Sequence, residues 1–392
     1  MTRRVARAAG AVAALLASTT RGAALGPPIE LWGPLQPGTH AIGFRVLNAK
    51  DQSRRLPGTN AARPLQISVW YPARDGSPPP MTYGDYVLLG ASEKTLVPPS
   101  PAESEETFAA YRRFLGGVGA PAGAIDDWLG ARMAARRDGE PARGRFPLIV
   151  VAQGNGGAAP DHALLAEYLA SHGYVVATSP SQARLGDSMN RDADILPSAM
   201  AQARDLAFVV RELRSFPTAD AGPLGLVGYS FGGRSALLLA GREPRVQAFV
   251  SLDSGIAAKA GRDWLPRGGW DASAVRTPIL HLFQDREDFV TPDLGLLARL
   301  KKSDRRLLRI SDMGHFDFIT YGMASAVVPE LAPEAGPRRV ARKVQAVFAY
   351  VEAFLDAALK NDAEGSRFLD RSPEENGLPP GLLTRARMKP VS

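Results

Sequence analysis

Apolar residues along the chain fall into short, regularly spaced runs that predict strands alternating with helices. The run at residues 147–152 is continuously apolar, which is typical of a strand buried on both faces of a parallel sheet. Further predicted strands are residues 174–178, 224–227, 248–252, 278–283 and 306–310. Predicted helices are residues 161–171, 199–215, 294–301 and 340–359, and another begins just after residue 230. Strands that alternate with helices indicate an α/β fold with a mostly parallel, doubly wound sheet.

The segment before these elements has a different pattern. Residues 65–71 alternate apolar and polar side chains, which predicts an antiparallel strand that ends at Pro72. Residues 75–145 contain clustered prolines and two segments with helical spacing, at 105–115 and 124–137. We interpret residues 75–145 as a helical insertion, which either covers a substrate site or serves only in packing.

The predicted elements are spaced closely enough to form one domain, at residues 26–362, and the sequence contains no internal repeat. Residues 363–392 are polar and include Pro379 and Pro380, which predicts a loosely held C-terminal tail.

The first 25 residues have the layout of a secretory signal peptide. Arg3, Arg4 and Arg7 precede a short apolar run at residues 8–17, and small residues at 22–24 could form a cleavage site. The apolar run is too short to span a bilayer, and no later segment is long and apolar enough to do so. The sequence therefore predicts a signal peptide at residues 1–25 and a secreted or periplasmic protein.

Composition narrows the function classes. Of 392 residues, 45% are hydrophobic and 22% are charged, which is ordinary for a globular domain. The net charge is +7, but the 47 Lys and Arg residues are scattered, so we expect no nucleic-acid binding. The absence of cysteine excludes disulfides, thiolate nucleophiles and cysteine-ligated metals.

The strongest chemical signal is the motif Gly-x-Ser-x-Gly at residues 228–232. It follows an apolar strand and precedes an Ala/Leu-rich helix, which is the setting of a nucleophile elbow. A serine on such a turn has its hydroxyl exposed, and glycine is needed two positions away on either side to avoid collisions. Ser230 is therefore the predicted nucleophile.

A serine nucleophile needs a base, and the chain has five histidines. His315 lies just past the last predicted strand, which is where this fold carries its base. We expect structural roles for His40, His162, His172 and His281. No two histidines have a metal-ligand spacing, so we expect neither a metal site nor a cofactor.

The base needs a carboxylate that fixes its tautomer and stabilises its charged form. Asp253 and Asp288 each follow a predicted strand, and the position of each alone does not choose between them. An oxyanion hole needs two backbone N–H groups. We predict those of Phe231, next to the nucleophile, and of Asn155, in the glycine-rich turn after the first parallel strand.

Six short segments of the chain resemble segments that occur in the same order in a known family. They are residues 69–72, 153–156, 169–174, 228–233, 252–253 and 315–318. Over residues 40–320 the chain resembles the predicted dienelactone hydrolases and the lipoprotein-associated phospholipases, which hydrolyse platelet-activating factor, within the α/β-hydrolase superfamily. The resemblance implies an α/β-hydrolase fold and favours Asp253 as the acid, because in this family the acid follows the strand immediately after the elbow. In many other α/β-hydrolases the acid follows the next strand, which is the position of Asp288 in this chain.

The chain departs from this family at two points. Gln153 stands where a histidine is common, which bears on the oxyanion turn. True dienelactone hydrolases use a cysteine nucleophile, and this chain has no cysteine.

These residues together predict a serine hydrolase that cleaves carboxylic esters through an acyl-enzyme, similar to a carboxylesterase or a lipase. Phospholipid acyl chains, short acyl esters, lactones and polyesters remain open as substrates, and the expected partner is a small-molecule or lipid ester. A peptidase or amidase of the same fold is one alternative, and a non-catalytic binding protein on a hydrolase scaffold is another. The oligomeric state is not encoded in any recognisable pattern.

Overall fold

The computed structural model describes residues 32, 35–76, 78–187, 192–259, 265, 270–286, 289–325, 328–331 and 337–388. The strands are β1 (Ala41–Arg55), β2 (Ala62–Ala73), β3 (Pro80–Thr82), β4 (Arg132–Arg137), β5 (Phe146–Ala152), β6 (Val175–Thr178), β7 (Ala219–Tyr229), β8 (Val246–Leu252), β9 (Ile279–Gln284), β10 (Arg305–Ile310) and β11 (Leu383–Met388). The helices are α2 (Tyr83–Leu88), α3 (Pro101–Gly117), α4 (Ala122–Leu129), α5 (Ala163–Ser171), α6 (Ile195–Glu212), α7 (Gly232–Ala240), α9 (Gly295–Arg299), α10 (Thr320–Ala324), α11 (Pro337–Leu359) and α12 (Ala363–Asp370). The predicted signal peptide lies outside the described residues.

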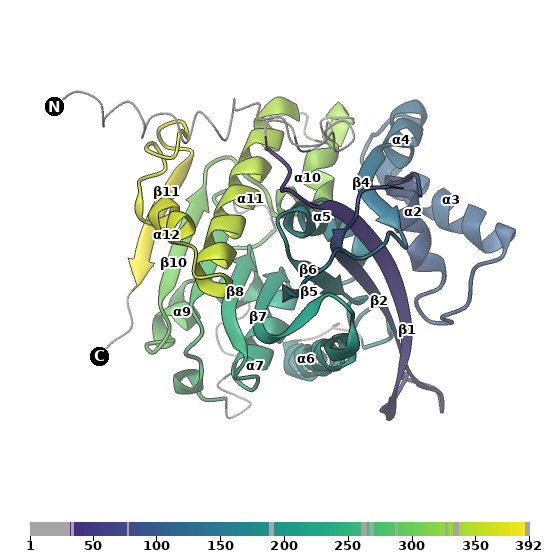
Figure 1. The fold of residues 1–392 in the computed structure, drawn as a ribbon, viewed down its shortest axis with the longest axis horizontal. Coiled ribbons are helices and arrows are strands. Elements are labelled where there is room, and N and C mark those ends of the chain that lie inside the picture. Colours follow the sequence, from purple (N-terminus) through teal and green to yellow (C-terminus); the bar gives the residue numbers. More distant parts are fainter. Residues whose placement is uncertain are drawn as a thin grey trace.

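One sheet runs through the whole molecule, in the order β11-β10-β9-β8-β7-β5-β6-β2-β1-β4-β3 (Figure 1). The pairs from β6 to β10 are parallel, and β2 joins β6 antiparallel. The strand order reverses at β5, which has β6 on one side and β7 on the other, and this makes the sheet doubly wound. The structure confirms the predicted fold class.

Two apolar layers cover the two faces of the sheet. Along β5, Ile149 and Val151 pack in the cluster that holds α5 and α11, whereas Leu148 and Val150 pack in the cluster that holds α6 and α7. This alternation follows from the two-residue period of a strand. Burial of each Val, Leu or Ile side chain stabilises the fold by about 1.5–3 kcal/mol. A central strand is buried on both faces, so continuously apolar runs are expected there.

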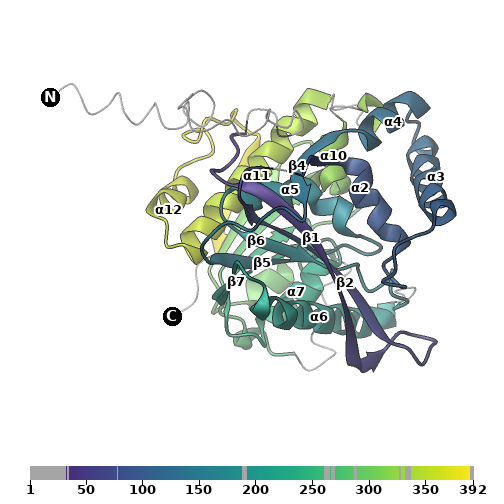
Figure 2. The same ribbon diagram turned by 45° about the vertical axis from the view of Figure 1, so that its right-hand side comes forward.

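The insertion occupies the end of the sheet beside β1. Figure 2 shows α2, α3 and α4 grouped there, next to β4 and α10. The predicted helix at residues 124–137 is wrong in its second half, because α4 ends at Leu129 and residues 132–137 form β4. Ile42, Gly43 and Phe44 of β1 pair in parallel with β4. This pairing overrides the helix propensity of an Ala/Arg-rich segment.

A buried glutamate ties the insertion to the central domain. Glu167 of α5 accepts hydrogen bonds from the Tyr86 hydroxyl of α2 at 2.6 Å and from the backbone N–H groups of Ala134 and Ala135 in β4, at 2.8 and 3.2 Å. Tyr86 itself accepts a hydrogen bond from Trp70 Nε1 of β2. Burial raises the pKa of Glu167 to about 7, because the charged form loses its hydration.

This raised pKa predicts a pH-dependent stability. Between about pH 4.5 and 7 the folded chain holds a proton on Glu167 that the unfolded chain releases, so the free energy of unfolding falls as pH rises through this window. Glu167→Gln removes that dependence. The stability advantage of the wild type over Glu167→Gln should shrink by about 3 kcal/mol from pH 4.5 to pH 8.

Urea unfolding of both proteins at the two pH values, followed by circular dichroism, measures this change. Glu105→Gln, on an exposed position of α3, controls for the loss of a surface carboxylate. A stability difference between wild type and Glu167→Gln that is constant across the pH range would contradict the prediction.

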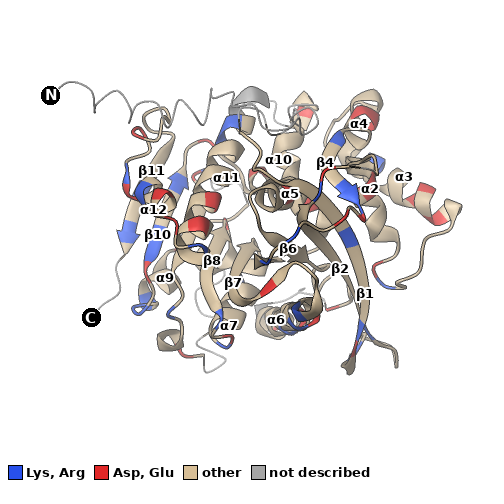
Figure 3. Cartoon of the chain, viewed as in Figure 1, with Lys and Arg blue, Asp and Glu red and all other residues tan. Residues whose placement is uncertain are grey.

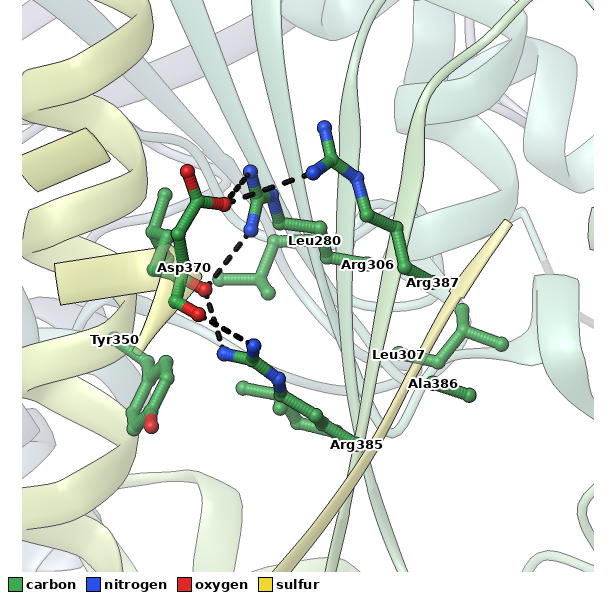
Figure 4. Close-up of a pocket in the computed structure, with 10 residues that line it drawn as sticks. Leu280, Arg306, Leu307, Tyr350, Asp370, Arg385, Ala386 and Arg387 are labelled. Atoms are coloured by element: carbon green, nitrogen blue, oxygen red, sulfur yellow. Dashed lines mark hydrogen bonds and ion pairs between the residues drawn. The ribbon is translucent and has the colours of Figure 1, made fainter. Parts of the chain in front are cut away.

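The C-terminal residues are part of the sheet rather than a loose tail. β11 pairs antiparallel with β10 over six residues, from Arg305–Met388 to Ile310–Leu383. The side chain of Arg385 donates to backbone carbonyls around Asp370 at the end of α12 (Figure 4). Arg306 and Arg387 form ion pairs with the Asp370 carboxylate. The expected domain boundary at residue 362 is therefore not a structural one.

Charged residues of both signs are distributed along the fold. Arginines of β10 and β11 lie together at one edge of the sheet, while acidic and basic residues are interspersed over the other elements (Figure 3). Within the described ranges, no helix has the length and apolar content needed to cross a membrane.

Candidate active site

Ser230 sits on a tight turn between β7 and α7. Its φ is +50°, in the left-handed region that costs a non-glycine residue about 1–3 kcal/mol. A Cβ on Gly228 would lie 2.6 Å from the Cα of Gly233, and one on Gly232 would overlap the carbonyl oxygen of Ala152. The two glycines therefore let the strand, the turn and the helix approach closely enough to project the Ser230 hydroxyl.

His315 follows β10 and begins a short 3₁₀ helix, His315–Phe318. Its Nε2 lies 2.9 Å from Ser230 Oγ, and only 2% of the residue is exposed. The imidazole is stacked between two aromatic rings, Tyr229 at 5.0 Å and Phe289 at 4.8 Å between centroids. Tyr229 also donates a hydrogen bond from its hydroxyl to the His315 carbonyl. These contacts fix the orientation of the imidazole ring and the position of the residue's backbone.

Asp253 follows β8 and is brought next to the same histidine. Its Oδ2 lies 2.6 Å from His315 Nδ1, and the Gln284 backbone N–H donates to its Oδ1 at 3.3 Å. Asp253 is 2% exposed and has a φ of +37°. With Nδ1–H donating to this carboxylate, His315 Nε2 is left as the acceptor for the Ser230 hydroxyl. Asp288, the other candidate acid, lies outside the described residues.

The turn after β5 lies beside the serine. A Cβ on Gly154 would come 3.2 Å from Ser230 Cβ, so glycine permits this approach. Gly156 has a φ of +78°, and the side chain of Asn155 accepts a hydrogen bond from Gln182. Neither the backbone N–H of Asn155 nor that of Phe231 is bonded to an acceptor in the described part of the chain.

A buried polar network behind this turn was not identified from the sequence. The side chain of Gln153 donates to Thr178 Oγ1 at 2.9 Å and accepts from His162 Nδ1 at 2.8 Å. Gln202 of α6 donates to the Gln153 carbonyl at 2.9 Å and accepts from the Ser235 hydroxyl of α7 at 2.7 Å. Only the departure from the family at Gln153 hinted at it, because the partners are distant in sequence.

The other histidines have structural contacts, none of which reaches Ser230. Burial lowers the pKa of His162 and of His281 to about 3 each, so both are neutral at ordinary pH. His281 Nδ1 lies 2.8 Å from the Ser251 hydroxyl. His172 Nε2 lies 3.1 Å from Glu352 Oε1 on α11.

A cleft of about 860 Å³ opens over Ser230 and His315. Its floor is formed by the turn at residues 154–158, and one wall by residues of α2 and α3, including Tyr83, Val87 and Tyr111. Phe289 and Phe316 also line the cleft. The volume is in the range of small-molecule sites. Of the two roles considered for the insertion, the structure shows that it lines this cleft.

Charged groups at the cleft are few. Arg184 forms an ion pair with the buried Glu93 of the insertion, and desolvation raises the pKa of Glu93 to about 7. Desolvation also raises the pKa of Asp161 to about 6. Among the described residues, no group of three His, Asp or Glu side chains is arranged to hold a metal ion.

A doubly wound sheet, a serine on a strained turn between strand and helix, and a histidine after the last parallel strand together define an α/β-hydrolase. The model of the dienelactone hydrolase family matches residues 134–303. The matched segment contains Ser230 and Asp253 and ends before His315. Residues 134–303 are thus similar to the dienelactone hydrolase family, and the fold is that of an α/β-hydrolase.

Comparison with solved structures agrees on the fold. A ferulic acid esterase from Streptomyces cinnamoneus superposes with a TM-score of 0.63 over 94% of this chain and 98% of that chain, at 21% sequence identity. In all, 594 chains of solved structures match. A search of curated proteins found no match.

Proposed function

We propose that this protein hydrolyses carboxylic esters with Ser230 as its nucleophile, through an acyl-enzyme. The observation that carries the proposal is the continuous series from Ser230 Oγ to His315 Nε2 at 2.9 Å and from His315 Nδ1 to Asp253 at 2.6 Å. Such a series activates a serine hydroxyl that is otherwise a weak nucleophile. Ser230 and His315 of this series line a cleft of about 860 Å³, a volume in the range of small-molecule sites.

The proposed reaction has two stages. Ser230 Oγ attacks the ester carbonyl as His315 Nε2 takes its proton, and Asp253 stabilises the imidazolium that forms. The backbone N–H groups of Asn155 and Phe231 hold the oxyanion. His315 then protonates the departing alcohol. In the second stage a water molecule attacks the acyl-enzyme with His315 as base, which releases the acid and restores Ser230.

The comparisons support an ester hydrolase. The family that matches is named for a lactone hydrolase, and a lactone is a cyclic ester. The structural neighbour is named as an esterase. We also propose that residues 1–25 direct export of the enzyme from the cytoplasm, as their composition predicts.

Hydrolysis of p-nitrophenyl esters from acetyl to palmitoyl tests the proposal, together with labelling by a fluorophosphonate. We expect turnover of at least one ester and one labelled site at Ser230, and the chain-length profile measures the pocket. A wild-type protein that is inert on every ester would overturn the proposal. Faster cleavage of matched anilides than of esters would indicate a peptidase, and a protein that shows neither labelling nor turnover would indicate a binding protein.

The buried network behind the turn gives this mechanism a positioning residue. The two oxyanion donors lie on different elements, Asn155 after β5 and Phe231 before α7, so their separation depends on how the elements are joined. Gln202 joins them, because it bonds the Gln153 carbonyl at the start of the turn and Ser235 in α7. Gln202 is 1% exposed, so no water replaces a lost bond readily.

Gln202→Met should therefore lower kcat about 10- to 100-fold and leave KM within about threefold, because a displaced donor weakens transition-state binding alone. Steady-state kinetics on one p-nitrophenyl ester measure this split. Gln345→Met is the matched control, because Gln345 is also buried but its Oε1 has no partner in the described structure. Equal losses in both variants, or a rise in KM alone for Gln202→Met, would exclude the positioning role.

A further inference from the structure

Exposed large apolar side chains are concentrated at the mouth of the cleft. In the described part of the chain, five such residues are largely exposed, and four of them line the cleft: Phe114, Val118, Phe289 and Phe316. The fifth, Val97, does not line it. Exposed apolar patches of this kind mark binding surfaces, because leaving them in water is unfavourable.

The apolar lining of the cleft is mainly aromatic rather than aliphatic. Seven of its 24 lining residues are Phe or Tyr, whereas aromatic residues make up 7% of the whole chain. The seven are Tyr83, Tyr111, Phe114, Tyr229, Phe289, Phe316 and Tyr321. Larger aliphatic side chains are fewer, and they are Val87, Val118 and Ile319. The lining of the cleft is thus enriched in planar rings and not only in apolar side chains.

The rings form two aromatic walls in the lining of the cleft, one from the insertion and one from residues 289–321. In the wall from the insertion, Tyr111 lies 6.1 Å from Tyr83 and 6.5 Å from Phe114 between ring centroids. In the second wall, Phe316 lies 5.5 Å from Phe289, tilted by 57°.

The second wall reaches the reactive groups directly, because Phe289 stacks on the imidazole of His315. Phe114 is 60% exposed and Phe289 is 67% exposed, so much of their ring surface is open to a ligand. Both walls thus end in rings that are free to contact a substrate.

We propose that the substrates are esters that carry a planar aromatic group, which packs against these walls while its carbonyl carbon lies at Ser230. This inference rests on the proposed ester hydrolysis and names its substrate class. Stacked and edge-to-face ring pairs add attraction beyond the area that they bury, because the ring face is negative and the edge positive. A saturated ring of the same carbon skeleton buries at least as much apolar surface but lacks this attraction.

Two matched pairs of esters test the proposal. Methyl 3-phenylpropanoate against methyl 3-cyclohexylpropanoate places the ring on the acyl side, and 2-phenylethyl acetate against 2-cyclohexylethyl acetate places it on the alcohol side. We expect kcat/KM to be about 3- to 10-fold higher for the aromatic member of at least one pair. The pair that shows the preference identifies which side of the ester packs against the walls.

A variant assigns the preference to the walls. Phe114→Leu keeps an apolar side chain at an exposed position of α3, so the fold is retained. It should reduce the aromatic preference, the ratio of the two kcat/KM values, by about two- to threefold. Val97→Ala, an exposed apolar residue outside the cleft, should leave both rates unchanged.

The outcomes separate the two proposals. Equal or faster turnover of the cyclohexyl esters in both pairs overturns the aromatic substrate class but leaves ester hydrolysis intact. A preference that persists unchanged in Phe114→Leu also overturns the role of the walls. A wild type that is inert on all four esters and on p-nitrophenyl acetate overturns the proposed function itself.

Discussion

Replacing Ser230 by alanine is expected to lower kcat for ester hydrolysis by about 10⁴- to 10⁶-fold. The alanine has no atom that can attack the carbonyl, and His315 then has no proton to accept from residue 230. Substrate binding should persist, since the cleft walls are unchanged and alanine is smaller than serine. Steady-state rates on p-nitrophenyl acetate, with active-site titration of the wild type, measure the loss.

A matched control removes a different serine hydroxyl. Ser181 is buried near the turn after β5, and its Oγ has no hydrogen-bond partner in the described structure. Ser181→Ala should therefore keep wild-type kcat within about twofold. If Ser230→Ala retains more than about 1% of wild-type activity, Ser230 is not the nucleophile and the proposed mechanism fails.

Asp253→Asn is expected to lower kcat by about 10³- to 10⁴-fold. An amide NH₂ next to His315 Nδ1 favours the tautomer that carries its proton on Nε2, and that tautomer cannot accept the Ser230 proton. Because Asp253 Oδ2 lies 2.6 Å from His315 Nδ1, exchange of a carboxylate oxygen for an amide NH₂ changes the tautomer of the imidazole directly. Comparison of kcat, rather than KM, isolates the effect on chemistry.

Asp288→Asn provides the comparison that the two candidate acids require. With Asp253 as the acid, Asp288→Asn should keep kcat within about fivefold of the wild type. A greater loss in Asp288→Asn than in Asp253→Asn would reverse the assignment. Thermal melting of both variants checks that the difference concerns catalysis rather than folding.

The central part of the fold was predictable because its signals are local. A strand buried on both faces must be apolar throughout, and β5, β6 and β8 lie within one or two residues of their predicted bounds. The elbow at Ser230 was also predictable, since the glycines that the turn requires, at positions 228 and 232, lie with the serine in one motif of five consecutive residues. The fold class followed from the order of these elements.

Other elements depend on partners that lie far away in the sequence. β4 reads Arg-Met-Ala-Ala-Arg-Arg, a composition that favours a helix, yet it pairs with β1 about 90 residues earlier. β11 contains two arginines and lies at an edge, so it lacks the apolar run of a central strand. Such strands form because of the neighbouring strand with which they pair, and their own composition does not predict them.

The same reason limits prediction of the site. The serine and histidine carried positional signals, and the family resemblance favoured Asp253. The link from Gln202 to Gln153 joins residues 49 apart, and nothing in either local sequence marks it. The aromatic walls come from residues 83–114 and 289–321, so only the folded chain shows that they face one cleft.

β11 covers the outer edge of β10, and His315 follows β10 directly. In a chain without residues 383–388, Ser230, Asp253 and His315 would all be present, but the strand that leads to the histidine would become an unpaired edge of the sheet. The support of His315 thus depends on a strand about 70 residues further along the chain.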